Sequence, residues 1–255
     1  MTYDPQSKQT DASVAKNISF FQGNLQAYNT NVQELDTYAA IRASINQSLP
    51  GISRLLDIGN GGVFDYDIGL VHSIVALDLF LDDLPASYVC PTNVTLKTGS
   101  ALSVPEPDES FEGVLVVMLI HHLTGKTVSE SLGNVRRAIR EAFRVLRPGG
   151  KLVIIESCVP QWFYLFERSA FRPASFLINK LLQHPATLQY PVSLLEQIIE
   201  EHNSKAEVLP IPKGRWVLQY GFKFPAALTP VVPYRLVAYK PDSVMPHRKA
   251  DLRHE

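Results

Sequence analysis

Two acids and a glycine-rich turn form the first candidate site in the sequence. Asp57 lies two residues before Gly59, Asn60 and Gly61 follow, and Asp78 ends the next apolar run. Glycines in such a turn let the backbone approach a ligand and adopt φ values that other residues avoid. An acid at the end of the second strand can accept hydrogen bonds from both hydroxyls of a ribose. The pattern therefore predicts a site for a ligand that contains a nucleoside.

The glycine spacing separates two kinds of nucleoside ligand. A dinucleotide fingerprint requires a third glycine three residues after its second, and Phe64 occupies that position here. Asp57 would lie near a cationic group of the ligand, which a pyrophosphate lacks. S-adenosylmethionine carries an ammonium, a sulfonium and a ribose. These residues therefore favour S-adenosylmethionine over a dinucleotide.

The elements that must position these residues are strands of a parallel sheet. Short apolar runs predict strands at 53–58, 74–77, 94–96, 113–120 and 151–156. From Ile52 onward we expect strands to alternate with helices, which is typical of a parallel sheet covered on both faces. Ligands of such sheets bind outside the carboxyl ends of the strands, where Gly59 and Asp78 both lie.

Helices are predicted on both sides of this core. Apolar residues recur at steps of three and four over 13–50, which predicts one or two helices with a break at 29–31. They either pack on the sheet or form a lid, in which Phe21 and Tyr28 would supply aromatic surface. On the other side of the core, a helix begins at Thr127 with capping-box spacing and ends at 148–150.

Composition restricts the class of protein. The 255 residues suit one large α/β domain, and 24 Lys and Arg nearly balance 25 Asp and Glu, so no nucleic-acid partner is expected. Cys90 and Cys158 are too few for a disulfide framework or a zinc ribbon, and the N-terminus has no signal peptide pattern. Charged residues interrupt the apolar window 162–182. We therefore expect a cytoplasmic protein without a transmembrane segment.

Four blocks of sequence, taken together and in order, resemble the class I S-adenosylmethionine-dependent methyltransferases, in particular the small-molecule branch of methyltransferase type 11. The blocks are 56–61, 75–78, 107–123 and 144–152. The resemblance implies an α/β fold, a Rossmann-like doubly wound sheet of seven strands that is mostly parallel, with an antiparallel last strand. The final strand pair is expected at 206–209 and 234–240.

The resemblance also implies roles for the residues that bind the cofactor. Asp57 would lie near the ammonium, Gly59, Asn60 and Gly61 along the methionine part, and Asp78 at the ribose hydroxyls. Leu79, Ser100 and Ala101 would lie beside the adenine, and Met118 near the cofactor at the end of the fourth strand. The chain departs from the family pattern in three ways: Val63 replaces a common glycine, Ser100 replaces an aspartate, and the interval from Asp57 to Asp78 is short.

Two adjacent histidines are the candidate catalytic residues. His121 and His122 directly follow the fourth predicted strand, at the rim where substrate and cofactor would meet. Histidine suits a general base near neutral pH. Because side chains alternate along a strand, at most one of the pair is expected to face the pocket if strand geometry persists. The alternative is that both only order the loop, and no metal site is expected from this spacing.

Two apolar insertions are expected to recognise the substrate. The segments 158–205 and 211–233 follow the fifth and sixth predicted strands, and Ser193 would cap a helix in the first. The prolines at 225, 230 and 233 are expected to break regular structure in the second. With the N-terminal lid, the candidate residues for substrate binding are Phe21, Tyr28, Trp162, Tyr164, Trp216 and Tyr220. The alternative is a homodimer surface or an extension of the core.

The sequence thus predicts a disordered tail at 1–12, a single methyltransferase domain at 13–240 and a flexible tail at 241–255. The expected reaction is transfer of a methyl group from S-adenosylmethionine to an oxygen, nitrogen or carbon atom of a mainly apolar small molecule, leaving S-adenosylhomocysteine. Two alternatives stay open. The same fold and cofactor could serve a non-methylating rearrangement or cyclisation, or the protein could be a binding or regulatory protein without cofactor affinity.

Overall fold

The computed structural model describes residues 35–182, 187–219 and 222–242. The predictions for 1–12, for Phe21, Tyr28 and Tyr220, and for 243–255 lie outside these residues. None of the helices described has the length and apolar character needed to cross a lipid bilayer.

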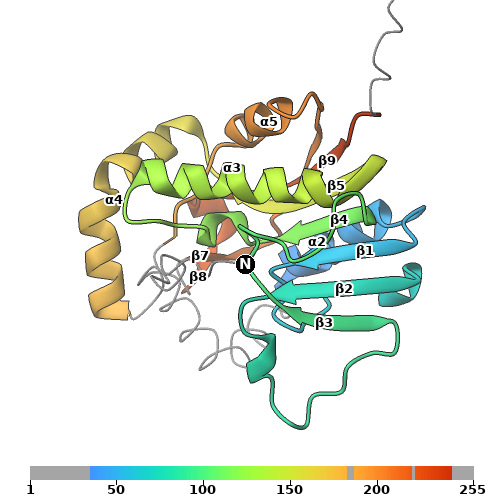
Figure 1. Cartoon of the computed structure of the whole chain (residues 1–255). Helices are drawn as coiled ribbons and strands as arrows, with labels where there is room; N and C mark the ends of the chain where they lie inside the picture. The colour runs from blue at the N-terminus through green and yellow to red at the C-terminus, as the bar shows by residue number, and fades with distance from the viewer. Residues whose placement is uncertain (1–34, 183–186, 220–221, 243–255) are drawn as a thin grey trace, which may run out of the picture.

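A seven-stranded sheet forms the centre of the molecule, with the strand order β3-β2-β1-β4-β5-β9-β6 (Figure 1). Its strands are β1 (Arg54–Ile58), β2 (Ser73–Asp78), β3 (Val94–Thr98), β4 (Phe111–Val117), β5 (Leu146–Cys158), β6 (Glu207–Pro210) and β9 (Val232–Tyr239). The first five strands pair in parallel, and β9 pairs antiparallel with both β5 and β6. The predicted mostly parallel sheet with an antiparallel last strand is therefore confirmed.

Helices cover both faces of this sheet. They are α2 (Asp36–Ser48), α3 (Val128–Val145), α4 (Gln161–Leu182) and α5 (Val192–Glu200). On one face, α3 and α5 pack on residues such as Leu56 and Ile154, and on the other face α2 packs on Leu55 and Val153. Successive strand residues thus point into two separate apolar layers, which explains why the strands are apolar throughout.

The ends of two helices test the predicted capping. The Oγ1 of Thr127 accepts a hydrogen bond from the Glu130 amide at 3.1 Å, which confirms the start of α3. The predicted Ser193 cap is wrong, because α5 begins at Val192 with Pro191 as its N-cap and no side chain caps it. Pro191 has a φ of −64° and a ψ of 144°, and its carbonyl accepts from the amides of Leu194 and Leu195 at 3.1 and 3.4 Å.

Pro148, Gly149 and Gly150 belong to β5 and do not form the loop expected after α3. The helix ends at Val145, and β5 begins at the next residue. Backbone hydrogen bonds join Gly149 N to Lys240 O and Lys240 N to Gly150 O, both at 2.9 Å. Pairing with Lys240, the residue after β9, therefore extends β5 toward its amino end. Local sequence does not reveal this long-range contact.

The first three connections of the sheet contain no α-helix, so the expected alternation of strand and helix from Ile52 is wrong there. Between β1 and β4, the described connections carry only short 3-10 turns, at Ile68–Leu70 and Leu81–Asp83. The Asn93 side chain holds the first turn by donating to the carbonyls of Ile68 and Val71 at 2.9 and 3.0 Å. The missing helix also accounts for the short interval between Asp57 and Asp78.

The second insertion contains regular structure despite its prolines. Strands β7 (Trp216–Gln219) and β8 (Phe222–Pro225) form an antiparallel pair, which corrects the expectation of an irregular segment. Pro225 lies at the very end of β8, where a strand tolerates proline. The hairpin lies against α2, because the Thr37 hydroxyl donates to the Trp216 carbonyl at 3.0 Å.

Candidate functional site

A cavity of about 240 Å³ opens at the carboxyl ends of β1, β2 and β4. All nine residues predicted to bind the cofactor line it: Asp57, Gly59, Asn60, Gly61, Asp78, Leu79, Ser100, Ala101 and Met118. The sheet brings them together because parallel strands end at a common edge. The sequence interpretation missed other wall residues, among them Tyr66, Phe80 and Leu119.

The glycine turn has a backbone conformation that favours glycine at three positions. Gly59, Gly61 and Gly62 have φ values of +78°, +61° and +80°, in the left-handed region that side chains disfavour. A Cβ atom on Gly59 would lie 2.8 Å from the Leu119 side chain, so a larger residue would also collide with the opposite wall. The bare backbone therefore faces a narrow part of the cavity.

Asn60 holds this turn together. Its Nδ2 donates to Asp57 Oδ2 at 2.6 Å and to the Val63 carbonyl at 2.8 Å, while its Oδ1 accepts from the Gly62 amide at 2.9 Å. Val63 does not have a positive φ, which explains why valine is tolerated where the family often has glycine. The departure at Val63 therefore leaves the turn intact.

Asp57 is a buried acid with two hydrogen-bond donors. Tyr66 donates its hydroxyl to Asp57 Oδ2 at 2.8 Å, beside the Asn60 amide. Burial raises the pKa of Asp57 to about 7, although both hydrogen bonds act in the opposite direction. The nearby charge of Asp78 raises this pKa further. A cation beside Asp57 would stabilise its carboxylate form.

Asp78 is positioned by the backbone around it. Its Oδ2 accepts from the Gly61 amide at 2.9 Å and its Oδ1 from the Leu79 amide at 2.6 Å. Burial raises the pKa of Asp78 to about 6, against these backbone hydrogen bonds. Each oxygen keeps a further lone pair, so the fixed carboxylate can accept from two neighbouring hydroxyls.

The charges of the cavity test whether S-adenosylmethionine fits. Three acids line its wall, Asp57, Asp65 and Asp78, and no lysine or arginine does so among the residues described. A pyrophosphate would meet only negative charge here. A ligand with an ammonium, a sulfonium and a ribose matches these acids and the bare glycine turn. The residues present therefore fit S-adenosylmethionine.

Ser100 and Met118 form other parts of the wall. Ser100 Oγ accepts from the Leu102 amide at 3.1 Å, so the serine that replaces the expected aspartate also shapes its own turn. Met118 has a φ of +50°, which is uncommon for a residue other than glycine. Backbone strain of this kind gathers at binding sites. Here it turns the chain after β4 so that Leu119 faces Gly59.

The two histidines lie in a 3-10 turn, Ile120–His122, and their rings stand side by side at 4.1 Å between centroids. His122 lines the cavity and His121 does not. His121 Nδ1 lies 2.7 Å from Glu156 Oε1, near the carboxyl end of β5. Glu156 was not predicted as a site residue, and an acid within an apolar strand was the available signal.

The predicted substrate-binding residues that are described do not line this cavity. Trp162 on α4 is 66% exposed and Trp216 on β7 is 42% exposed, whereas Tyr164 is buried with its ring 5.9 Å from that of Tyr190. These three lie in or beside the two insertions. Their contact with a substrate therefore stays a prediction.

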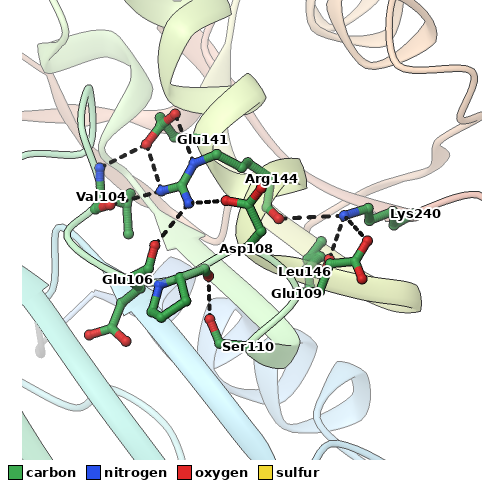
Figure 2. Close-up of polar contacts among 10 residues, drawn as sticks. Val104, Glu106, Asp108, Glu109, Ser110, Glu141, Arg144, Leu146 and Lys240 are labelled. Atoms are coloured by element: carbon green, nitrogen blue, oxygen red, sulfur yellow. Dashed lines mark hydrogen bonds and ion pairs between the residues drawn. The ribbon is translucent and has the colours of Figure 1, made fainter.

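A separate polar network lies at the other end of the strands, just before the amino end of β4 (Figure 2). Arg144 at the end of α3 donates to Asp108 Oδ1 at 2.7 Å and to both oxygens of Glu141 at 3.2 and 2.9 Å. The same guanidinium binds the carbonyls of Val104 and Glu106, each at 2.8 Å. Two of the four sequence blocks therefore meet in a network that positions the chain, away from the cavity.

Comparisons with known proteins agree with this geometry. The family model described as "Methyltransferase domain" matches residues 56–154. A demethylmenaquinone methyltransferase of Symbiobacterium thermophilum is 32% identical over 78 residues, which cover 31% of this chain and 27% of that protein. The ubiquinone/menaquinone biosynthesis C-methyltransferase UbiE of Paracoccus denitrificans is 36% identical over 124 residues, covering 46% and 45%. The chain thus matches less than half the length of these relatives.

Solved structures share the fold. The N-methyltransferase NodS of Bradyrhizobium japonicum, in complex with S-adenosylhomocysteine, has a TM-score of 0.51 and 13% identity, covering 80% of this chain and 88% of that one. The [4+2]-cyclase SpnF has a TM-score of 0.55 and 16% identity, covering 79% and 81%. The family match, the sheet order and the cavity together identify residues 56–154 as the core of a methyltransferase domain with the fold of S-adenosylmethionine-dependent methyltransferases.

Proposed function

We propose that the protein transfers a methyl group from S-adenosylmethionine to an oxygen, nitrogen or carbon atom of a mainly apolar small molecule, and so forms S-adenosylhomocysteine. The observation that carries this proposal is the cavity, which combines a left-handed glycine turn with two buried acids. When bound, S-adenosylmethionine supplies a methyl group already activated by its sulfonium. Holding the acceptor in line with that group can supply about 7–11 kcal/mol of the barrier reduction.

Each cofactor-binding role follows from the chemistry of the wall. Asp57 accepts from the ammonium, with Tyr66 and Asn60 keeping its carboxylate in place. Asp78 accepts from the ribose hydroxyls. Gly59 and Gly61 would lie along the methionine part, Leu79, Ser100 and Ala101 beside the adenine, and Met118 near the cofactor at the end of β4.

The acceptor binds on the side of the two insertions. Trp162 and Trp216 are exposed there, and Phe21, Tyr28, Tyr164 and Tyr220 complete the set proposed to contact it. Two curated relatives are named for methylation of demethylmenaquinone and in ubiquinone/menaquinone biosynthesis. Apolar aromatic acceptors with hydroxyl groups are therefore the first class to test.

The experiment measures cofactor binding and product formation separately. Isothermal titration gives the dissociation constant of S-adenosylmethionine, and mass spectrometry measures S-adenosylhomocysteine after incubation with aromatic acceptors, among them 1,4-dihydroxynaphthalene and 1-naphthylmethylamine. We expect binding without acceptor and product only with acceptor. Absence of binding at millimolar cofactor would contradict the proposal. Consumption of an acceptor without S-adenosylhomocysteine would show a rearrangement.

A further inference from the structure

Glu156 is a buried acid whose hydrogen bonds converge on the turn after β4. Its side chain is 1% exposed, and among the residues described no lysine or arginine pairs with it. Its Oε2 accepts from the Ile120 amide at 2.8 Å, and its Oε1 accepts from the Ser157 amide at 2.7 Å. The carboxylate is thereby fixed in one orientation.

The same carboxylate determines how His121 carries its proton. His121 Nδ1 lies 2.7 Å from Glu156 Oε1, and an ionised carboxylate can only accept a hydrogen bond. The proton of a neutral His121 must therefore be on Nδ1, which leaves the lone pair of Nε2 available. Fixing one ring nitrogen in this way is how proteins set the role of the other.

His121 lies on the side of the cavity that faces the first insertion. Its ring lies 4.1 Å, between centroids, from the tilted ring of His122, which lines the cofactor cavity. Its carbonyl accepts from the Leu188 amide at 3.0 Å, in the segment that leads to α5. His121 is thus placed between the cofactor site and the insertion proposed to hold the acceptor.

We propose that His121, held by Glu156, accepts with Nε2 the proton of a phenol-type hydroxyl on the acceptor. This inference rests on the proposed function and names its substrate class. The O–H bond breaks, its electron pair goes into the conjugated acceptor, and the acceptor oxygen or a ring carbon forms the bond to the methyl carbon. The bond from that carbon to sulfur breaks with its pair on sulfur, and the proton on Nε2 passes to solvent.

The phenol class follows from what such a base can do. An ammonium can lose its proton to solvent before it binds, and the neutral amine then attacks through its nitrogen lone pair, so it needs no base within the site. A phenolic hydroxyl, with a pKa of about 10 as in tyrosine, can give its proton to an imidazole when the transfer is coupled to bond formation. The buried carboxylate would stabilise the imidazolium that results.

Among the residues described, the ionisable groups around the pair are His122 in the same turn, Cys158 on β5 and Tyr190 before α5, with Tyr164 and Glu167 of α4 beside Tyr190. Burial and the charge of Glu156 raise the pKa of Cys158 well above its ordinary value. Burial also raises the pKa of Tyr190, with smaller contributions from Tyr164 and Glu156. Both groups therefore stay neutral between pH 6 and about 9, and only His122 must be separated from His121 by mutation.

The decisive variant is His121→Asn, because the asparagine amide can keep the hydrogen bond to Glu156 while the base is lost. With 1,4-dihydroxynaphthalene as the acceptor, we expect kcat at pH 7 to fall by about 10²–10⁴-fold with cofactor affinity unchanged. The loss should shrink toward pH 10, where the acceptor ionises in solution. Wild-type kcat in His121→Asn, or a loss that is constant with pH, would overturn the base role.

Two further variants test whether Glu156 acts by positioning the His121 ring and whether the neighbouring His122 has a different role. Glu156→Gln should lower kcat by at least about tenfold and move the His121 proton from Nδ1, as seen in long-range ¹H–¹⁵N correlation spectra of the whole protein. His122→Asn should change cofactor affinity more than kcat, and exposed His72→Asn should change neither. A wild-type His121 protonated on Nε2 would overturn the inference even without turnover. Methylation of 1-naphthylmethylamine alone would overturn the phenol class, whereas no product with any acceptor would contradict the proposed function.

Discussion

Acidic side chains at the two ends of the sheet have opposite surroundings. At the carboxyl ends of β1 and β2, burial raises the pKa of Asp57 to about 7 and that of Asp78 to about 6. At the amino end of β4, the hydrogen bond from Arg144 lowers the pKa of Glu141. One end thus keeps its acids poorly neutralised, whereas the other supplies a guanidinium that binds two acids and two carbonyls (Figure 2).

This difference separates the residues that stabilise the fold, around Arg144, from the buried acids Asp57 and Asp78, which we expect to gain a cationic partner only when a ligand binds. A buried acid without a cation destabilises the cofactor-free protein, and it becomes favourable when a ligand brings the charge. A paired acid stabilises the protein at all times. The two ends should therefore respond in opposite ways to mutation and to pH.

Asp57→Asn should produce the largest effect at the carboxyl end. Removing one partner of a buried charge pair costs about 2–5 kcal/mol, so the dissociation constant of S-adenosylmethionine should rise by about 30- to 5000-fold. The asparagine still accepts from Tyr66 and Asn60, so the unfolding free energy of the cofactor-free protein should not decrease. Isothermal titration and urea unfolding test this pair of results. A comparable loss of stability would remove the distinction between the two ends.

Arg144→Met should have the complementary effect at the amino end. The methionine keeps an apolar stem but loses the charged hydrogen bonds to Asp108 and Glu141, which should lower the unfolding free energy by about 2–3 kcal/mol. Cofactor affinity should stay within about twofold. The matched control is Arg136→Met, whose pair with Glu201 is exposed on both sides and should cost less than about 1 kcal/mol. Weakened cofactor binding in Arg144→Met alone would show coupling between the ends.

The pH dependence should have opposite signs at the two ends. Asp57 and Asp78 have raised pKa values when folded, so the stability of the cofactor-free protein should fall as pH rises from about 4 through about 7. Glu141 has a lowered pKa, so its contribution is present at neutral pH and is lost as pH falls. The urea midpoints of wild type, Asp57→Asn and Glu141→Gln are measured against pH. The difference between wild type and each variant gives the pH dependence that the missing acid contributes. If both acids changed stability with pH in the same direction, the proposed difference between the two ends of the sheet would be contradicted.

Tyr66→Phe should give the smallest effect and sharpen the role of Asp57. The Tyr66 hydrogen bond lowers the pKa of Asp57, so its loss should move the midpoint of pH-dependent cofactor binding upward. At pH 7 the affinity should fall by about 1 kcal/mol, or about fivefold. Tyr88→Phe is the control, because Tyr88 donates to the Gly62 carbonyl at 2.9 Å and does not contact Asp57. If both variants shifted the pH midpoint of cofactor binding equally, the shift would come from a change in the glycine turn and not from the hydrogen bond to Asp57.

The parts of the site that the sequence predicts are those tied to local chemistry. Glycines with left-handed backbone and acids at strand ends are visible as residue types, and the structure brings Asp57, Asp78, Gly59 and Gly61 to one cavity, together with the other five predicted cofactor residues. Tyr66 and Glu156 were missed because their roles arise from tertiary contacts, to Asp57 and to His121. Tyr66 has no local signal, whereas Glu156 stands out as an acid within an apolar strand, although the sequence does not reveal its partner.

The fold shows the same division between local and long-range signals. Strand periodicity and the Thr127 cap predict β1 to β5 and α3. The early start of β5 depends on pairing with Lys240, far away in the sequence. The hairpin of β7 and β8 likewise depends on pairing between two short segments and on packing against α2.

The absence of α-helices from the connections between β1 and β4 has a consequence for motion. Without α-helices, many amides between Gly59 and Ser110 lack a regular ladder of hydrogen bonds, unlike those of β4 and β5. Such segments open locally at a smaller free-energy cost than the global unfolding of the core. Their amides should exchange with deuterated solvent well before those of the central strands. Ligand binding, which orders the walls of the cavity, should slow that exchange most at the glycine turn.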